Sequence, residues 1–324
     1  MPYHTYDNLV FLFKSLALQY EVIGQSVLGK DLYLFRIGNE NANSIFFMGS
    51  IHGNEHSGAE LLYYFANWLV KSNDPVASDL LANSQILILP VANPDGFEAW
   101  TRINANGVDL NRNFPKGWGG AGSNPGCGCT ICRGNAEADQ PEVQSILACW
   151  NKYQPTIGVT IHTGMELIAY PWGCWSTPVE NITIYGGLYQ AYKTLALQNG
   201  VEPYLFGQTN LSQIDLAQPV AIAQFPYSIY PACGDCIDTM QDRGMLGFTL
   251  EATQEFKPPY EDLEAKYFPR FLPFAITCTQ SVYTPIVPVQ PPPSPPPPFN
   301  GIFPILTVLG FGVTTCVAIY YSLK

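Results

Sequence analysis

Two histidines and a glutamate in this sequence have the types and positions expected of a metal site. His52 and Glu55 stand three residues apart in the segment HGNEHSG, where Gly53 and Asn54 favour a turn that directs both side chains at one point. His162 is one of four histidines in the chain. Two imidazoles and one carboxylate leave a zinc ion a fourth position for water. The sequence therefore predicts one Zn²⁺ ion held by His52, Glu55 and His162.

A second pair, His52 and His56, has the four-residue spacing of the zinc peptidases that carry the HExxH motif. In that motif a glutamate follows the first histidine and both histidines lie on a helix. Here Gly53 follows His52, and the segment precedes the predicted helix. We therefore exclude this alternative.

Four short apolar runs each lead directly into polar residues. They are residues 44–50 before His52, 86–92 before a long polar loop, 157–161 before His162, and 247–250 before Glu251. Runs of this length are typical of buried strands. Ligands bind beyond the carboxyl ends of the strands in open α/β sheets. The runs therefore predict a crevice in which His52, His162 and Glu251 converge.

The long polar loop, residues 93–115, reads NPDGFEAWTRINANGVDLNRNFP and carries two arginines ten residues apart, Arg102 and Arg112. Its glycines, prolines and asparagines predict a turn-rich connection without regular helix or strand. A loop this long inside a compact domain is typically functional.

The rest of the pattern predicts one α/β domain with a largely parallel or mixed sheet. Apolar residues at helical spacing predict a first helix within the N-terminal 20 residues and another that begins near Pro141. Ser57 and Glu60 have the spacing of a capping box, which predicts a helix that begins at this point. No repeat or change of composition divides residues 1–284, which we assign to one catalytic domain.

The C-terminal region differs from this domain. Residues 302–321 are uncharged and mostly apolar, which is enough to cross about 30 Å of hydrocarbon. The preceding run PPPSPPPP forms an extended spacer that cannot bury an apolar face. We therefore predict a proline-rich linker at 285–300 and a transmembrane helix at 301–322, so that a C-terminal single-pass anchor places the protein in a membrane.

Two features of the sequence give opposite orientations in that membrane. No leader is visible at the N-terminus, which favours a cytosolic domain. Lys324 is the one charge beyond the predicted span, and it favours a cytosolic tail with the domain on the other side. The side of the catalytic domain therefore stays open.

The charge limits the classes of partner that we expect, and the cysteine content bears on the cellular compartment. The chain has 15 Lys and Arg against 26 Asp and Glu, a formal net charge of −11, and no basic cluster, so we expect no nucleic acid partner. Eight of nine cysteines precede the predicted span, which is compatible with disulfides in an oxidising compartment. The CGCTIC run, Cys127 to Cys132, suggests a structural zinc site, but no fourth ligand is near, which favours a disulfide-pinned or free-thiol loop.

Five separated motifs resemble those of the zinc carboxypeptidases. They are His52-x-x-Glu55, the NPDG turn followed by Arg102, GVDLNRN with Asn111 and Arg112, His162 before YPWG, and FTLE ending at Glu251. Their order and context agree over about residues 3–280, so the resemblance is specific. It implies a single α/β domain with a mixed, mostly parallel central β-sheet flanked by helices on both faces.

The resemblance also implies the chemistry of the matching residues. His52, Glu55 and His162 would hold the zinc ion, which would polarise a carbonyl and acidify a bound water. Glu251 would be the general base that takes a proton from this water and passes it to the leaving amine.

Further roles implied by the resemblance fall in the polar loop. Arg102 would stabilise the oxyanion of the tetrahedral intermediate, and Asn111 with Arg112 would bind the terminal carboxylate of the substrate. Asp109 would orient a ligand histidine.

The segment SIYPACGDCIDTM would shape the pocket for the released side chain. Tyr230 stands at the position of the mobile tyrosine that closes over substrate in animal-type members. Ile237 aligns with the floor of the pocket, which implies a preference for apolar or aromatic C-terminal residues. Asp235 would instead attract a basic side chain, and the sequence leaves both preferences open.

We therefore expect a monomeric, zinc-dependent metallocarboxypeptidase that hydrolyses the C-terminal peptide bond of peptides or proteins. One alternative is a murein-peptide or isopeptide amidase of the same family, because HGNEHSGAELL and GVDLNRNFP are closer to bacterial-type members. The other alternative is a non-catalytic membrane protein that binds C-termini. Metal ligands, base and arginines are all present, which argues against the second alternative.

Overall fold

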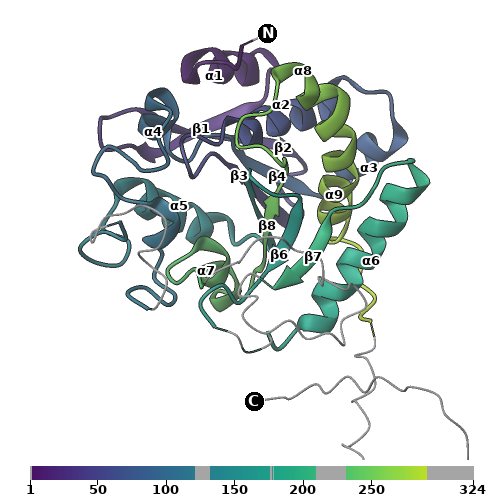
Figure 1. Ribbon diagram of the computed structural model, residues 1–324. Coiled ribbons are helices and arrows are strands. Elements are labelled where there is room, and N and C mark those ends of the chain that lie inside the picture. The colour runs from purple at the N-terminus through teal and green to yellow at the C-terminus, as the bar shows by residue number, and fades with distance from the viewer. Residues whose placement is uncertain (1, 121–131, 176, 178, 209–230, 290–324) are drawn as a thin grey trace, which may run out of the picture. The chain divides into compact units, whose positions relative to one another are not determined.

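The centre of the molecule is a mixed β-sheet (Figure 1). The computed structural model describes residues 2–120, 132–175, 177, 179–208 and 231–289. Within these residues, eight strands lie in the order β1-β2-β4-β3-β5-β8-β6-β7. Their bounds are β1 Gln19–Gln25, β2 Asp31–Gly38, β3 Ser44–Gly49, β4 Gln85–Leu89, β5 Ile157–His162, β6 Leu167–Tyr170, β7 Leu205–Gln208 and β8 Leu246–Glu251. Four of the strand pairings are parallel and three are antiparallel, which confirms the mixed sheet.

Helices cover both faces of the sheet. The α-helices are α1 Tyr6–Ser15, α2 His56–Lys71, α3 Pro75–Asn83, α4 Pro94–Ala99, α5 Pro141–Tyr153, α6 Ile182–Gln198, α7 Cys236–Asp242, α8 Tyr260–Asp262 and α9 Phe268–Gln280. A 3₁₀ turn, η1, spans Leu110–Arg112, and a π-helical turn, η2, spans Leu263–Tyr267. In Figure 1, α2, α6 and α9 lie on one side of the sheet and α5 and α7 on the other. The helices predicted at the N-terminus and near Pro141 are confirmed as α1 and α5.

The two faces of the sheet belong to two separate hydrophobic cores. In β3, Ile45 and Phe47 pack in the core with α2 and α9, whereas Phe46 and Met48 pack in the core with α5 and α7. This alternation follows from the two-residue period of a strand. A strand that is buried on both faces reads as a continuous apolar run, and for this reason the sequence reveals β3 and β4 so plainly.

The register of three parallel strands brings their ends to one edge of the sheet. Gly49 of β3 pairs with Ile161 of β5, and His162 of β5 pairs with Glu251 of β8. All four strands predicted from apolar runs are present as β3, β4, β5 and β8. The residues that follow or end these strands are therefore neighbours in space.

The capping box predicted at the start of α2 is wrong. The helix begins at His56, and the preceding Glu55 makes no side-chain hydrogen bond to the helix. The reason is that Ser57 lies inside the helix, where its hydroxyl contacts the Tyr3 hydroxyl at 3.0 Å, while the Glu55 carboxylate is turned toward His52 and His162. Glu60 is fully buried within the helix and accepts a hydrogen bond from the backbone N–H of His4, which ties the N-terminal segment to α2.

The prediction of no regular structure in residues 93–115 is also wrong in part, because this stretch contains α4 and η1. The Asn93 side chain accepts from the N–H of Gly96 and Pro94 occupies the first turn, so a cap and a preset backbone angle begin α4. The Asp109 side chain accepts from the N–H of Asn111 and begins η1 in the same way.

The described chain continues past the predicted domain end at 284. Residues 285–289 lie along α6, where the N–H of Val289 donates to the carbonyl of Thr183 at 3.1 Å. The rest of the predicted linker and the predicted span at 301–322 lie outside the described residues. Among the helices that the structure describes, none has the length and apolar character to cross a membrane.

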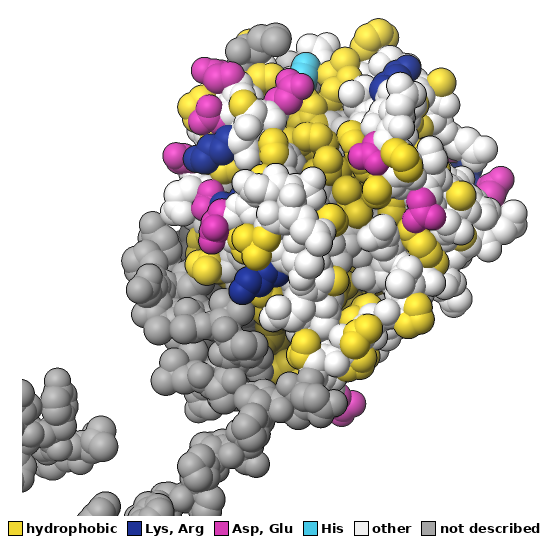
Figure 2. All heavy atoms as spheres, turned by 90° about the vertical axis from the view of Figure 1, so that its right-hand side faces the viewer, with side chains coloured by type: hydrophobic (Ala, Val, Ile, Leu, Met, Phe, Trp, Pro, Cys, Tyr) yellow, Lys and Arg dark blue, Asp and Glu magenta, His cyan; other side chains and the backbone are white. Residues whose placement is uncertain are grey.

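On the face in Figure 2, hydrophobic side chains gather near the centre and Lys and Arg side chains stand apart from one another.

Two phenylalanines offer a matched test of the core. Phe65 of α2 is fully buried between β3 and α9, whereas Phe11 of α1 is 70% exposed. We expect Phe65→Ala to lower the free energy of unfolding by about 3–5 kcal/mol, because it leaves a cavity. Phe11→Ala should change it by less than about 0.5 kcal/mol. Urea unfolding of both variants measures the difference, and equal losses would contradict the assignment of this core.

Candidate active site

Three polar side chains converge at the carboxyl ends of β3 and β5. His52 and Glu55 lie in the turn between β3 and α2, and His162 is the last residue of β5. Gly58 lets the first turn of α2 approach β5 closely, since an added Cβ would lie 2.9 Å from the carbonyl oxygen of Ile161. The turn is thereby held against the end of β5.

The distances among these side chains define a single centre. Glu55 Oε1 lies 2.8 Å from His52 Nδ1, and Glu55 Oε2 lies 3.0 Å from His162 Nδ1. The two Nδ1 atoms are 3.1 Å apart. All three residues are buried, and one ligand atom from each lies within 4.8 Å of the others. Two nitrogens that face each other and a carboxylate suit a cation between them, and this donor set fits one Zn²⁺.

Electrostatics favour the ligand forms of these groups. Burial opposes ionisation of Glu55, but the imidazoles of His52 and His162 outweigh it and hold its pKa below the ordinary value. Burial lowers the pKa of His162. A carboxylate anion and a neutral imidazole are the forms that bind a metal ion.

Asp109 connects the polar loop to this centre. Its Oδ2 accepts from Arg102 Nε at 2.8 Å, and its Oδ1 lies 3.3 Å from His52 Nε2. Burial opposes its ionisation, but Arg102 and His52 hold the pKa of Asp109 well below its usual range. The buried anion therefore orients both a metal ligand and a guanidinium, the role expected for Asp109 from the sequence.

Arg102 lies at the edge of the metal centre. Its Nη1 is 3.2 Å from His52 Nδ1 and 3.7 Å from Glu55 Oε1. The carbonyl of Arg102 accepts from the side-chain amide of Asn93 and from the N–H of Gly53. The NPDG turn thus fixes the backbone of Arg102 against the turn that carries the metal ligands.

Glu251 ends β8 directly opposite His162 in the strand register. Its Oε2 is buried and has no hydrogen-bond partner among the described residues. Burial and the nearby Glu55 carboxylate raise the pKa of Glu251 well above its ordinary value. A carboxylate of raised proton affinity beside a metal centre has the properties of a general base.

Asn111 and Arg112 belong to η1 and are both buried. Asn111 Oδ1 accepts from the N–H of Cys236 at 2.9 Å, so the side chain is anchored to the start of α7. Arg112 Nη1 donates to the carbonyl of Asn111 at 2.7 Å. Both residues are therefore held in place before any substrate arrives.

One cavity of about 350 Å³ contains most of the predicted site. It is lined by the three metal ligands, Glu251, Arg102, Asn111 and Arg112. Sequence reasoning missed further lining residues, among them Met165 and the exposed Phe256. Phe256 lies only five residues beyond Glu251, but nothing in its type distinguishes it from a surface residue.

Two predicted pocket residues have other outcomes. Ile237 is buried in the core with α5 and is absent from the described lining of the cavity, whereas Asp235 is part of that lining. Among the described residues, Ile237 is therefore not part of the cavity lining, where the resemblance places it as the pocket floor. Tyr230 lies outside the described residues. Of the CGCTIC run, Cys127 and Cys129 also lie outside them, and Cys132 is disulfide-bonded.

The contact of Asp109 with His52 yields a test of the metal centre. We expect Asp109→Asn to weaken zinc binding by about tenfold to a hundredfold, because the histidine loses the partner that orients it. Competition with a chromophoric chelator measures this affinity. Asp7→Asn, on the exposed surface of α1, is the control and should leave zinc affinity unchanged. Equal zinc affinities of the two variants would show that Asp109 does not contribute to zinc binding.

Comparison with known proteins agrees with this geometry. Residues 7–268 match a family model described as zinc carboxypeptidase. Carboxypeptidase SOL1 of Arabidopsis thaliana is 34% identical over 157 residues, which cover 46% of this chain and 30% of the relative. Carboxypeptidase A5 of Homo sapiens is 27% identical over 281 residues, which cover 78% of this chain and 61% of the relative. The chain thus spans less than two thirds of each of these relatives.

Solved structures share the fold. Bovine thrombin-activatable fibrinolysis inhibitor aligns with a TM-score of 0.72 at 18% identity, covering 87% of this chain and 97% of that structure. Carboxypeptidase A from Helicoverpa armigera aligns with a TM-score of 0.69 at 20% identity, covering 86% and 74%. Because the family match extends over most of the sequence and the fold agrees with it, this chain belongs to the zinc carboxypeptidase family.

Proposed function

We propose that this protein is a zinc-dependent metallocarboxypeptidase that removes the C-terminal residue of peptides or proteins. The observation that supports the proposal most directly is the single cavity shared by the metal ligands, Glu251 and Arg112. It combines a centre that can cut an amide bond with a buried cation that can receive a free carboxylate. An endopeptidase has no need for the second feature.

Recognition of the C-terminus would depend on η1. The guanidinium of Arg112 is permanently charged and pairs with a carboxylate through two parallel hydrogen bonds. Because Asn111 Oδ1 is taken by the N–H of Cys236, the amide Nδ2 is the group of this side chain that donates to substrate. Together they would place the terminal carboxylate, and hence the last peptide bond, at a fixed distance from the metal centre.

The chemical step would divide among three sets of residues. His52, Glu55 and His162 would hold zinc, which when bound supplies Lewis acidity and lowers the pKa of water. Glu251, which ends β8 opposite His162, would take the proton of the attacking water and pass it to the leaving amine. Arg102, anchored by Asp109, would donate to the scissile carbonyl oxygen as it gains negative charge.

The lining of the cavity favours a basic C-terminal residue. Asp235 supplies a carboxylate to the wall, and Leu167, Ala169 and Ala232 supply apolar surface. Burial and the adjacent Asp238 raise the pKa of Asp235 well above its ordinary value. A lysine or arginine side chain would therefore relieve an unfavourable negative charge, and its methylene stem would lie on the apolar wall. We propose this preference over the apolar one that Ile237 implied.

A panel of short peptides tests the activity. Purified full-length protein should release the last residue from peptides with a free C-terminus and leave their C-terminal amides intact, and a zinc chelator should abolish the release. Glu251→Gln should reduce kcat by about 10²- to 10⁴-fold, because the base is lost, while zinc content stays unchanged. Released amino acid is quantified by chromatography.

Other outcomes would redirect the assignment. Full turnover by the Glu251→Gln variant would show that another group is the base. A zinc-loaded protein that cleaves murein peptides but no ordinary peptide would indicate the amidase. Binding of peptide C-termini without any cleavage would indicate the non-catalytic protein.

The side-chain preference has its own test in Asp235→Asn. Asparagine keeps the cap that Asp235 provides to α7 through the N–H of Asp238 and removes only the charge. We expect kcat/KM for C-terminal Arg and Lys to fall by about tenfold to a hundredfold, as for the loss of a charged hydrogen bond. Values for C-terminal Leu and Phe should not fall. Asp242→Asn, at the exposed end of α7, is the matched control. A uniform loss across all four residues would refute the preference.

A further inference from the structure

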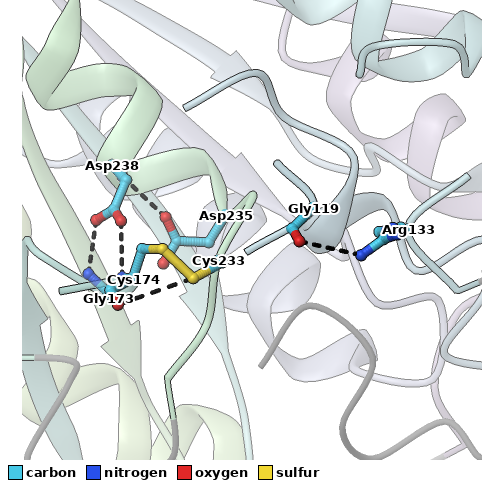
Figure 3. The surroundings of a disulfide bond; sticks show 7 residues. All are labelled: Gly119, Arg133, Gly173, Cys174, Cys233, Asp235 and Asp238. Carbon is cyan, nitrogen blue, oxygen red and sulfur yellow. Dashed lines mark hydrogen bonds between the residues drawn. A yellow bond between two sulfur atoms is a disulfide. The ribbon is translucent and has the colours of Figure 1, made fainter. Parts of the chain in front are cut away.

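A disulfide joins two segments that flank the substrate cavity. Cys174 lies shortly after β6, and Cys233 lies just before α7, 59 residues further along the chain. Figure 3 shows the bridge beside Asp235 and Asp238, with the N–H groups of Gly173 and Cys174 directed at the Asp238 carboxylate. Neither the family match nor the proposed chemistry gives this bridge a role.

Hydrogen bonds connect the same two segments around the bridge. The N–H groups of Gly173 and Cys174 donate to the two carboxylate oxygens of Asp238, at 2.6 and 2.9 Å. The N–H of Ala232 donates to the carbonyl of Gly173 at 2.8 Å. Asp238 is fully buried, and these contacts together with the disulfide form a seam between the two segments.

This seam is also part of the cavity wall. Ala232 and Asp235, on either side of Cys233, both line the cavity. Gly173 has no side chain at the point where the Asp235 carboxylate rests, and an added Cβ would collide with Asp235 Oδ2. The position of this carboxylate therefore depends on how closely the two segments are held together.

The backbone of two glycines, Gly117 and Gly120, packs closely against the two sulfur atoms. An added Cβ at Gly117 would lie 3.0 Å from Cys174 Sγ, and one at Gly120 would lie 2.8 Å from Cys233 Sγ. Gly117 has a φ of +74°, a conformation that also favours glycine. The loop after η1 thus packs directly on the bridge and leaves the two segments little room to shift while the bridge is intact.

We propose that Cys174 and Cys233 are a positioning pair for Asp235, and that their disulfide sets the affinity for the C-terminal side chain of the substrate. The inference rests on the proposed function, because it concerns the pocket for that side chain. Glu251 and His162 are held by paired strands and not by the seam. The bridge should therefore act on substrate binding and leave the chemical step nearly unchanged.

The experiment compares full-length protein with the Cys174→Ser/Cys233→Ser double variant. Cys149→Ala, which removes a buried free cysteine of α5, is the matched control. Peptide mapping without reductant first identifies the bridge in the wild type. Steady-state kinetics then give kcat and KM for peptides that end in Arg and in Leu. Equilibrium dissociation constants for the same peptides are measured in the Glu251→Gln background, where they are not cleaved.

We expect KM and the dissociation constant for the Arg peptide to rise about tenfold in the double variant, as when a charged hydrogen bond is misplaced. The kcat for both peptides, the affinity for the Leu peptide and the zinc content should stay within about twofold. A bridge that only stabilises the fold would lower the melting temperature without this selectivity. Equal loss for both peptides, unchanged affinity for the Arg peptide, or absence of the bridge would overturn the inference.

The role of the bridge can still be decided if the double variant does not fold or if the wild type shows no cleavage. If the double variant does not fold, folded wild-type protein is reduced under mild conditions and alkylated, peptide mapping selects samples in which Cys174 and Cys233 are modified and the disulfide of Cys132 is intact, and the same two peptides are compared. If the wild type binds the Arg peptide but cleaves nothing, the proposed activity fails while the dissociation constants still decide the role of the bridge. A wild type that cleaves the Leu peptide but does not bind the Arg peptide refutes the role of the bridge and leaves the proposed activity standing.

Discussion

The buried carboxylate of Glu55 is the interaction on which the rest of the site depends. Its two oxygens face His52 and His162, which come from the ends of neighbouring parallel strands. A charge buried at this depth is tolerable only with close partners. The sheet register that brings His162 to this carboxylate also brings Glu251 alongside, so one strand alignment assembles the predicted metal ligands and the proposed base together.

A second chain of contacts ties the polar loop to this centre. Asp109 accepts from Arg102 and lies beside His52, while the start of the same 3₁₀ turn places Asn111 and Arg112. The short helix α4 and the turn η1 are therefore not incidental to the loop. They fix the backbone of a loop that is rich in glycine, proline and asparagine. The proposed recognition of a terminal carboxylate at a set distance requires such a fixed backbone.

The cavity has two ends with different construction. The end with the metal ligands is built on strand ends and is held by backbone pairing across the sheet. The end with Asp235 is built on segments around α7 and is held by Asp238 and by the Cys174–Cys233 bridge. The proposed chemical step and the proposed side-chain preference thus depend on different parts of the fold.

The sequence by itself determined the strands and the residues at their ends, because a strand buried on both faces leaves an apolar run that ends where the polar ligands begin. Hence the family was predicted correctly, as was the grouping of His52, Glu55 and His162 into a site that fits one zinc ion, and Glu251 was correctly placed at a strand end. Only the tertiary structure decided that Asp235 faces the cavity while Ile237 enters the core. Successive residues of a helix point about 100° apart. An error of one residue in predicting where α7 begins therefore confuses a residue that lines the cavity with one that enters the core. Contacts between distant segments decide such placements, and local pattern does not record them.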